Sequence, residues 1–273
     1  MVTASLVLYN TKEDDLRNVI NCVQNSIIHT LIIIDNSPSD ILKAEIEKLS
    51  DKCMYISMQG NVGYGSAHNI GIKKAIEANA DYHIVLNPDI SFEPEVISKL
   101  LKFAERHKDV GLILPKVTYP NGDLQYLCKL LPSPIDIFGR RLLPKTIIKN
   151  RNDRFEMRQT GYNTIWNCPI LSGCFMFMNL SYLKQIGGFD ERFFMYFEDF
   201  DLMRRLHKVC KTVYYPLVSI VHNHAAEHHT NKALFKASIV SAIKYFNKWG
   251  WIFDKERAKV NKHAFDEENR IID

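Results

Sequence analysis

The sequence predicts an α/β protein in which helices flank a mostly parallel central sheet. Short apolar, β-branched segments alternate with segments of helical periodicity through the first half of the 273-residue chain, which is the pattern of βαβ units. Hydrophobic residues make up 46% of the chain, which is enough for a sizeable core in one large domain or two small ones. The predicted strands of this half are residues 5–9, 31–34, 54–57, 83–86 and 111–114.

Helices are predicted between these strands. Thr11 and Asp14 resemble a capping box, and apolar residues then recur at helical spacing through residues 16–27. After the fourth strand, Pro94 suits the first turn of a helix whose apolar stripe runs through residues 96–104. Farther along, the patterns predict a strand at 175–178, a helix at about 198–209, a strand ending at 222, and a helical tail from 231.

Prolines and basic residues interrupt the pattern between residues 119 and about 161. We expect a long, partly mobile connection that lies over the site. The predicted organisation is a domain over 1–224 followed by a C-terminal helical extension over 225–273. Within the domain, residues 1–115 form a nucleotide-binding half, and residues 116–224 form an acceptor and catalytic half.

The composition argues against several other classes of protein. A formal charge of +4 is small for this length and does not indicate a nucleic-acid-binding protein. The six cysteines are scattered without a C-x-x-C pair, as expected for reduced cytosolic thiols. No export signal is apparent at the N-terminus, and no apolar run approaches the roughly 20 residues that cross a bilayer. We therefore expect a cytoplasmic protein whose membrane association, at the inner face, is peripheral.

Polar residues directly after predicted strands mark a candidate site, because ligands bind beyond the carboxyl ends of strands in an open parallel sheet. Asp35 follows the second strand, and its carboxylate could accept the imide N–H of uracil or thymine. The alternative is an ordinary turn-capping aspartate. Asn87-Pro88-Asp89 follows the fourth strand and offers one carboxylate to Mg²⁺ or Mn²⁺, or else forms a plain turn.

The glycine-rich segment 60–71 follows the third strand and resembles a phosphate-binding loop. A dinucleotide fingerprint starting at Gly63 needs glycine where His68 stands, and a P-loop starting at Gly60 needs Lys where Ser66 stands. Neither motif fits. The segment instead predicts a close backbone approach to a nucleotide at the start of a helix.

Acidic and histidine residues in the second half complete the candidates. Glu198 and Asp199 follow the aromatic run 193–197, and an apolar wall raises the pKa of a carboxylate and makes it a better general base. Acidic residues in a first helical turn also occur for helix-dipole reasons alone. His222 and His224 share one face of a strand end, but they lack the H-E-x-x-H spacing of a zinc hydrolase.

Taken in order, these segments resemble the family 2 glycosyltransferases with the GT-A fold, and within them the bacterial rhamnosyltransferase-like branch. The resemblance extends from Ser5 to about His224. The motifs that carry it are Leu8-Tyr-Asn10, Ile34-Asp-Asn-Ser37, the segment 60–71, Leu86-Asn-Pro-Asp89, Ser172-Gly173, Gly187-Gly-Phe-Asp-Glu191, Phe197-Glu-Asp-Phe-Asp201 and Val221-His222.

The resemblance implies a role for each candidate. It implies that Asp35 reads the base, that Asn61 and Gly63 line the nucleotide, and that Asp199, beside Glu198, is the general base. Asp89 and His222, with His224 as the alternative, would hold Mg²⁺ or Mn²⁺. Asn87 stands where the usual D-x-D motif has its first carboxylate, a form typical of the rhamnosyltransferase-like branch. The remaining donor-binding residues that it implies are Tyr9, Asn10, Asn69, Asn87 and Gly173.

The implied activity is inverting transfer of a sugar, L-rhamnose from dTDP-rhamnose, to a hydroxyl of a glycan or lipid-linked glycan. Two alternatives stay open. A nucleotidyltransferase would need a Gly-rich basic loop, which residues 9–15 lack, and a non-catalytic nucleotide-sugar-binding protein would not need Asp199. The tail over 231–263 interleaves lysines with Trp249, Trp251 and Phe253, which suits an anionic membrane surface or a solvated helix packed on the domain.

Overall fold

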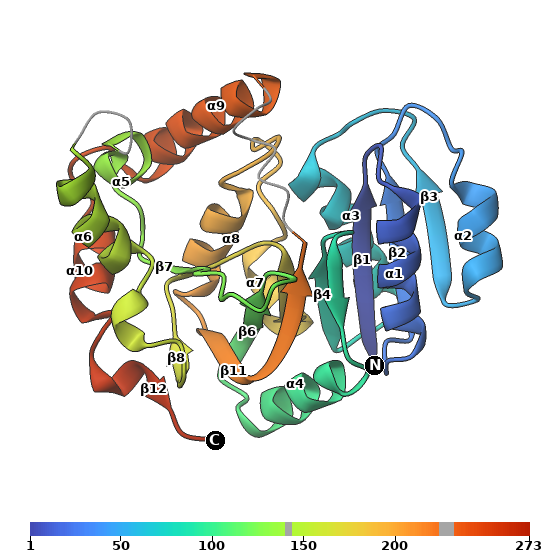
Figure 1. The fold of residues 1–273 in the computed structure, drawn as a ribbon, viewed down its shortest axis with the longest axis horizontal. Coiled ribbons are helices and arrows are strands. Elements are labelled where there is room, and N and C mark those ends of the chain that lie inside the picture. Colours follow the sequence, from blue (N-terminus) through green and yellow to red (C-terminus); the bar gives the residue numbers. More distant parts are fainter. Residues whose placement is uncertain (140–143, 224–231) are drawn as a thin grey trace.

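A computed structural model describes residues 1–139, 144–223 and 232–273 (Figure 1). A ten-stranded sheet runs through the molecule in the order β12-β8-β11-β6-β10-β4-β1-β2-β3, with β5 paired to β11. Its N-terminal half is parallel and consists of β1 (Val2–Leu8), β2 (Thr30–Asp35), β3 (Cys53–Ser57) and β4 (Tyr82–Leu86). β1, β2 and β4 are almost continuously buried because both faces of the sheet are covered, whereas the edge strand β3 is only partly buried.

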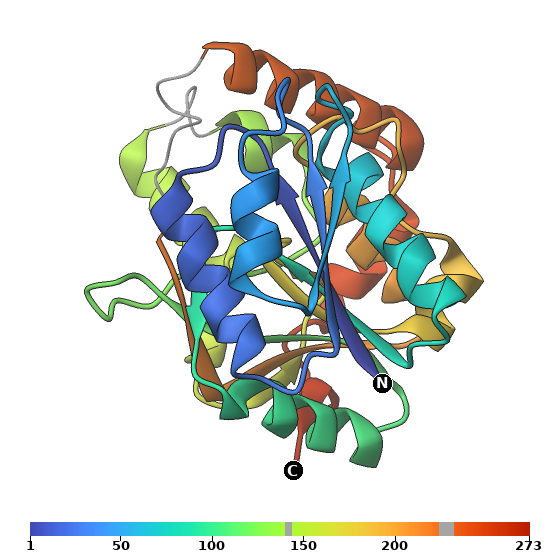
Figure 2. The ribbon, with the colours of Figure 1, turned by 90° about the vertical axis from the view of Figure 1, so that its right-hand side faces the viewer.

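Helices cover both faces of this half. α1 (Glu13–Gln24) and α3 (Tyr64–Glu77) lie on opposite sides of the sheet (Figure 2). The other helices of this half are α2 (Lys43–Leu49), which follows β2, and α4 (Glu95–Arg106), which follows β5 (Ile90–Phe92). The arrangement confirms the predicted fold class.

The C-terminal half of the sheet is mixed. β10 (Phe175–Asn179) runs antiparallel to β4 and to β6 (Val110–Thr118), between which it lies. β11 (Lys211–His222) pairs in parallel with β6 and antiparallel with β5 and β8 (Ile165–Asn167). Two helices connect β10 to β11, namely α7 (Leu180–Ile186) and α8 (Glu198–Leu206). Each predicted strand is present, within a few residues of its predicted bounds.

The connection from residue 119 onward is more ordered than the sequence indicated. It contains β7 (Cys128–Lys129), α5 (Pro134–Phe138), α6 (Lys145–Phe155) and a 3₁₀ turn, η2 (Arg158–Thr160). β7 pairs antiparallel with β9 (Ile170–Leu171). Ser133 and Asp136 form a capping box at α5, and Arg151 of α6 binds the Asp136 carboxylate. The sequence pattern did not indicate these helices, because short helices depend on tertiary contacts rather than on periodicity.

The C-terminal segment packs against the rest of the chain. α9 (Lys232–Trp249) buries Tyr245 and Phe246 in a second core cluster with Phe193 and Phe197. α10 (Lys255–His263) and η4 (Glu267–Asn269) then lead to β12 (Arg270–Ile271), which pairs with β8 at the edge of the sheet. Within the described ranges, no helix is both long and apolar enough to span a membrane.

Candidate active site

Asp35 ends β2 as a buried residue whose two carboxylate oxygens each accept one hydrogen bond. Its side chain is 1% exposed. The Tyr55 hydroxyl donates to Asp35 Oδ2 at 2.8 Å, and the backbone N–H of Ser37 donates to Oδ1 at 2.9 Å. Burial and the Asp35 charge raise the pKa of Tyr55, so that this phenol stays a donor. The two bonds fix a carboxylate at the carboxyl end of the parallel strands, where the sequence predicted the site.

The segment before α3 forms a tight turn next to Asp35. Asn61 Oδ1 accepts the backbone N–H of Gly63 at 2.9 Å, and the Asn36 amide donates to the Gly63 carbonyl at 3.3 Å. Gly63 has a φ of +92°, and a Cβ there would lie 2.5 Å from the Phe194 carbonyl oxygen. Glycine is therefore required at position 63 both for its backbone conformation and for this close approach.

Tyr64, the first residue of α3, joins three separate segments. Its hydroxyl lies 2.9 Å from Asn87 Oδ1 and 2.8 Å from the Gly173 carbonyl oxygen, so its single proton serves one acceptor at a time. Burial and the negative charges of Glu198, Asp199 and Asp89 raise the Tyr64 pKa well above its usual value. The phenol therefore remains protonated among these carboxyl groups.

Asp199 lies in the first turn of α8 with both carboxylate oxygens bonded to the backbone. Oδ2 accepts the N–H of Gly173 at 3.1 Å, and Oδ1 accepts the N–H of Phe200 at 2.9 Å. Burial raises the Asp199 pKa, while Lys129 and the two backbone N–H groups oppose the rise. A Cβ on Gly173 would lie 3.1 Å from Asp199 Cβ, so the absence of a side chain there lets the carboxylate approach the backbone.

Glu198 is 6% exposed, and its Oε2 has no hydrogen-bond partner in the described part of the chain. Burial and the neighbouring Asp199 raise its pKa well above the usual value. The preceding Tyr196 and Phe197 both adopt left-handed backbone conformations, with φ of 66° and 65°. Such strain costs on the order of 1–3 kcal/mol per residue and occurs preferentially at functional sites. Packing of Phe197 against α9 opposes relaxation of this turn.

Asp89 and His222 form a pair at the ends of neighbouring strand segments. His222 Nε2 lies 3.3 Å from Asp89 Oδ1. Gln125 holds the histidine from the other side, with its Oε1 3.0 Å from His222 Nδ1 and its amide donating to the His222 carbonyl at 2.8 Å. Burial alone would lower the His222 pKa, but the interactions with Asp89 and Cys174 together outweigh it and raise the pKa to about 10. His224 lies outside the described residues.

These residues fit a divalent cation that takes most of its ligands from elsewhere. In the described ranges, no group of three or more His, Cys, Asp or Glu side chains forms a closed metal cage. Mg²⁺ is usually held by one or two carboxylates together with substrate phosphates. Asp89 and His222, oriented by Gln125, suit such an open site better than a structural zinc site, which needs four protein ligands.

The other predicted donor-site residues lie at different places. Tyr9 is 51% exposed, and Asn10 adopts a φ of 49° and donates its backbone N–H to Ser37, beside Asp35. Asn69 instead holds the loop after α7. Its amide donates to the Phe189 carbonyl at 2.9 Å, and its Oδ1 accepts the Phe189 N–H at 2.8 Å. The structure thus assigns Asn69 contacts that support the loop rather than contacts at Asp35.

Three residues at the site were not predicted, namely Tyr64, Gln125 and Lys129. Each contacts its partner across a long stretch of chain, such as the 97 residues that separate Gln125 from His222. Gln125 and Lys129 belong to the connection after residue 119, which therefore reaches the site. Only the glycine-rich setting of Tyr64 was a signal in the sequence.

Two buried histidines join α3 to the sheet, His68 on α3 and His83 on β4. A chain of hydrogen bonds of 2.7–2.9 Å runs from Thr3 Oγ1 through His83 and Ser5 Oγ to His68, and it ends beside the Tyr64 ring. Burial lowers the pKa of both histidines, that of His83 to about 3. The pair is therefore neutral and supports the helix that carries Tyr64.

Comparisons with solved structures identify the fold. The crystal structure of GalNAc-T7 with UDP, GalNAc and Mn²⁺ matches with a TM-score of 0.63 at 14% identity, over 92% of this chain and 50% of that one. S. aureus TarS 1-349 in complex with UDP-GlcNAc matches with a TM-score of 0.60 at 14% identity, over 98% and 74% of the two chains. The chain has the GT-A fold of nucleotide-sugar glycosyltransferases, and it spans half the length of the first of these relatives.

The sequence comparisons give the family. The glycosyl transferase family 2 model matches residues 5–187, so the chain belongs to that family. An N-acetylglucosaminyl-diphospho-decaprenol L-rhamnosyltransferase of Mycobacterium tuberculosis is 29% identical over 76% of this chain and 74% of that protein. The rhamnosyltransferase WbbL of Escherichia coli is 25% identical over 84% and 85% of the two chains. These matches confirm the family predicted from the motifs.

Proposed function

We propose that this glycosyltransferase transfers L-rhamnose from dTDP-rhamnose, with inversion, to a hydroxyl of a glycan or lipid-linked glycan in bacterial cell-surface polysaccharide biosynthesis. The observation that carries the proposal is the convergence of Asp199, Asp89 and Asn87 around Tyr64. It brings the proposed base, Asp199, close to Asp89, the carboxylate of the proposed cation site. The rhamnosyltransferases at 29% and 25% identity support the choice of donor.

Residues 1–115 form the nucleotide-binding half in this proposal. Asp35 accepts the imide N–H of the base, and the turn at Asn61 and Gly63 packs against the nucleotide. Uracil and thymine both carry this N–H, so Asp35 favours them over bases that lack the donor but does not separate dTDP from UDP donors. Tyr9 and Asn10, next to Ser37, lie at the mouth of the same region.

Residues 116–224 provide the chemistry. Asp199 accepts the proton of the acceptor hydroxyl while the hydroxyl oxygen attacks the anomeric carbon and the bond to the diphosphate breaks. One such displacement inverts the anomeric centre. The backbone N–H groups of Gly173 and Phe200 hold the carboxylate in place, and its raised pKa improves it as a base. Burial and Asp199 raise the pKa of the adjacent Glu198 well above its usual value.

Asp89 and His222, or His224 in place of His222, would hold Mg²⁺ or Mn²⁺, and the cation would offset charge on the departing nucleoside diphosphate. Gln125 supports this assignment because it fixes the ring of His222 with Nε2 toward Asp89. The crystal structure of GalNAc-T7, which has the same fold, contains UDP and Mn²⁺, and this also supports divalent metal use. We further propose that the enzyme works at the cytoplasmic face of the membrane, which the C-terminal segment contacts peripherally.

A donor panel tests the proposal. The protein is incubated with UDP-, GDP- and dTDP-sugars in Mg²⁺, Mn²⁺ or EDTA, and the release of nucleoside diphosphate is followed. We expect selective release of dTDP from dTDP-rhamnose that EDTA abolishes. Binding of none of these nucleotide sugars, measured by calorimetry, would refute the donor class, and preference for another sugar would refute rhamnose.

Asp199→Asn separates an enzyme from a binding protein. We expect a loss of turnover of roughly 10²- to 10⁴-fold with donor affinity retained, because a general base contributes about this factor. Asp51→Asn, at an exposed position away from the site, is the matched control and should keep full activity. Normal turnover by Asp199→Asn would show that Asp199 is not the base.

A further inference from the structure

The turn between α9 and α10 presents large apolar side chains to solvent. Trp251 is 39% exposed, Ile252 78% and Phe253 94%. We call these three residues the apolar tip. Exposed hydrophobic residues that occur singly need no explanation, but three in succession at a turn mark an interaction site.

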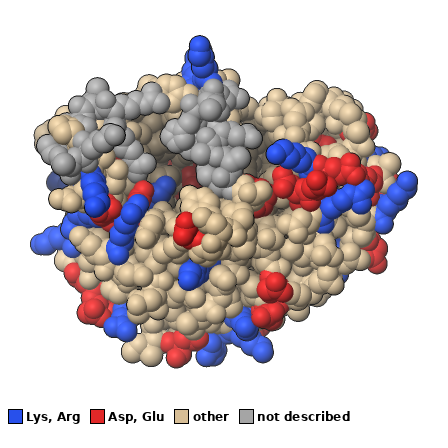
Figure 3. All heavy atoms as spheres, viewed as in Figure 1, with Lys and Arg blue, Asp and Glu red and all other residues tan. Residues whose placement is uncertain are grey.

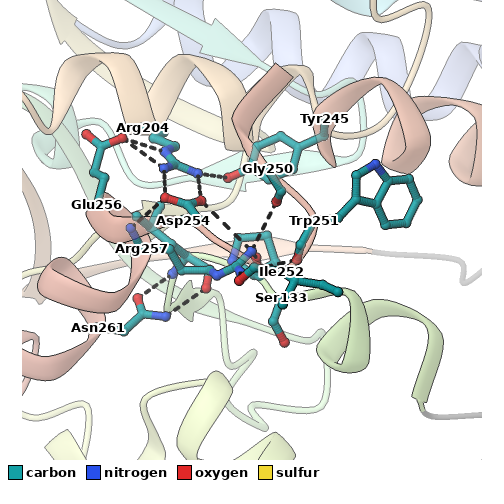
Figure 4. A network of polar contacts seen from close by, with 12 residues as sticks. Ser133, Arg204, Tyr245, Gly250, Trp251, Ile252, Asp254, Glu256, Arg257 and Asn261 are labelled. Atoms are coloured by element: carbon teal, nitrogen blue, oxygen red, sulfur yellow. Dashed lines mark hydrogen bonds and ion pairs between the residues drawn. The ribbon is translucent and has the colours of Figure 1, made fainter. Parts of the chain in front are cut away.

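The apolar tip is held rigidly from behind. Arg257 is 9% exposed, and its guanidinium donates to the carbonyl oxygens of Gly250, Trp251 and Ile252 at 3.1–3.4 Å (Figure 4). It also reaches the Pro132 carbonyl at 3.2 Å. A buried arginine that binds successive carbonyls turns the polar backbone inward and leaves the apolar side chains outside. These hydrogen bonds therefore fix the backbone conformation that exposes the apolar tip.

The apolar tip continues along the outer surface of α9. Trp251 Nε1 donates to Asn247 Oδ1 at 2.8 Å, which joins the tip to the last turns of the helix. Val240 and Ile243, 41% and 40% exposed, lie on the same helical face as Asn247 because residues three or four apart are neighbours. The surface is thus an apolar ridge that ends in the tip.

Charge is divided between the two sides of this segment. Residues 232–263 contain two acidic residues, Asp254 and Glu256, and both bind Arg204 of α8. Six lysines are exposed, and a basic side chain stands out in Figure 3 at the edge where α9 runs. These lysines are Lys232, Lys236, Lys244, Lys255, Lys259 and Lys262. Lys232 and Lys236 lie on the same helical face as Val240, so the ridge is basic as well as apolar.

An anionic bilayer fits this surface better than a protein partner does. A protein partner that covered the three side chains of the apolar tip would bury at most about 150–250 Å² of each. The total is less than the roughly 800 Å² per partner of a stable protein interface. Exposed Trp and Phe beside lysines, by contrast, are typical of segments that insert into the interface of anionic membranes.

We propose that the apolar tip inserts into an anionic lipid surface and that the exposed lysines bind the lipid headgroups. α9 packs on the aromatic run before the site, since Ser241 donates to the Met195 carbonyl at 2.7 Å. In Figure 1, α9 lies at the same edge of the molecule as the carboxyl ends of the parallel strands. Docking through this surface therefore brings the active site close to the membrane. The inference rests on the lipid-linked acceptor of the proposed function but not on the identity of the donor.

Vesicle co-sedimentation of the full chain tests the proposal without any nucleotide sugar. The probes are vesicles of phosphatidylcholine alone and of phosphatidylcholine mixed with phosphatidylglycerol. We expect binding only to the mixed vesicles, and weaker binding at high salt. Ile252→Ser with Phe253→Ser should reduce the bound fraction at least about tenfold, since burial of each side chain is worth roughly a factor of 10–100.

Matched controls keep the test specific. Ile41→Ser with Ile272→Ser removes two side chains that are 82% and 87% exposed elsewhere, and it should bind like the unaltered protein. The thermal melting temperature of both double variants should match that of the unaltered protein. Equal binding by the two variants would overturn the proposal, as would binding to neutral vesicles alone. Sedimentation velocity checks whether the apolar tip instead binds a second copy of the chain. A dimer that is present in the unaltered protein and absent in Ile252→Ser with Phe253→Ser would also overturn the proposal.

Discussion

Asp254→Asn tests how firmly the C-terminal segment holds α8, the helix that begins with Glu198 and Asp199. Arg204 of α8 donates to both carboxylate oxygens of Asp254, at 2.7 and 2.8 Å, and the two side chains are 2% and 3% exposed. Asparagine keeps the size and the capping ability of aspartate at the start of α10, where residue 254 accepts the N–H of Arg257. The substitution therefore removes the charge and one of the two oxygens that accept from Arg204.

The expected loss is set by the partners that remain. Removing one member of a buried ion pair costs about 3–5 kcal/mol when the other charge is left alone. Here Glu256 still accepts two hydrogen bonds from Arg204, so we expect about 2–3 kcal/mol. With an unfolding entropy of about 2.1 cal/mol/K per residue, 273 residues give about 0.6 kcal/mol per kelvin. The melting temperature should fall by about 4–5 °C.

Calorimetry at several pH values measures this loss. Arg204 holds the pKa of Asp254 below its usual value despite the burial that would raise it. The contribution is then fully present above the unfolded pKa of about 3.9 and lost as pH falls through the folded pKa. The difference in the free energy of unfolding between the unaltered protein and Asp254→Asn should be constant from pH 7 to 5. It should become smaller below pH 4. Glu267→Gln, in an exposed pair with Arg270 at 3.8 Å, is the control. A shift no larger than that of the control would refute the reasoning.

Three further predictions address the site and its support. Activity should fall as pH drops through the raised pKa of Asp199, so the acid limb of the pH–rate profile should lie above 3.8, the ordinary pKa of an aspartate. An acid limb at or below pH 3.8 would contradict the assignment of Asp199 as the base. Gly173→Ala should lower turnover more than donor affinity because its Cβ would press on Asp199 at 3.1 Å, whereas Gly60→Ala meets nothing within 4 Å and should retain activity. Stability measured by urea unfolding should decline below about pH 6.5, since His68 and His83 bind protons only when unfolded, and a flat profile would refute their burial as neutral groups.

Local patterns in the sequence determined the fold class and the family. The strands at residues 31–34 and 83–86 could be predicted because both faces of a parallel sheet are buried, which leaves continuous apolar runs. The polar residues after them, Asp35 and Asp89, lie at strand ends as expected, because the carboxyl ends of parallel strands form one edge. Short-range order and motif spacing were sufficient for these predictions.

Long-range contacts decided the rest of the site. Tyr64 meets the carbonyl of Gly173 across 109 residues, and no local pattern encodes that distance. Asn69 looked like a donor ligand in its motif, yet its amide is occupied by the Phe189 backbone. The helices α5 and α6 escaped prediction because helices this short are stabilised by tertiary contacts.

The C-terminal segment shows most clearly what the sequence determined and what it did not. Composition alone revealed a basic tail with aromatic residues at 249, 251 and 253. Only the tertiary structure separated Trp249, which donates to the buried Asp201 at 2.8 Å, from Phe253, which is 94% exposed. The physical reason is that a turn such as the one at Gly250 has no periodicity, so the direction of each side chain depends on Arg257 and the carbonyl oxygens that it binds.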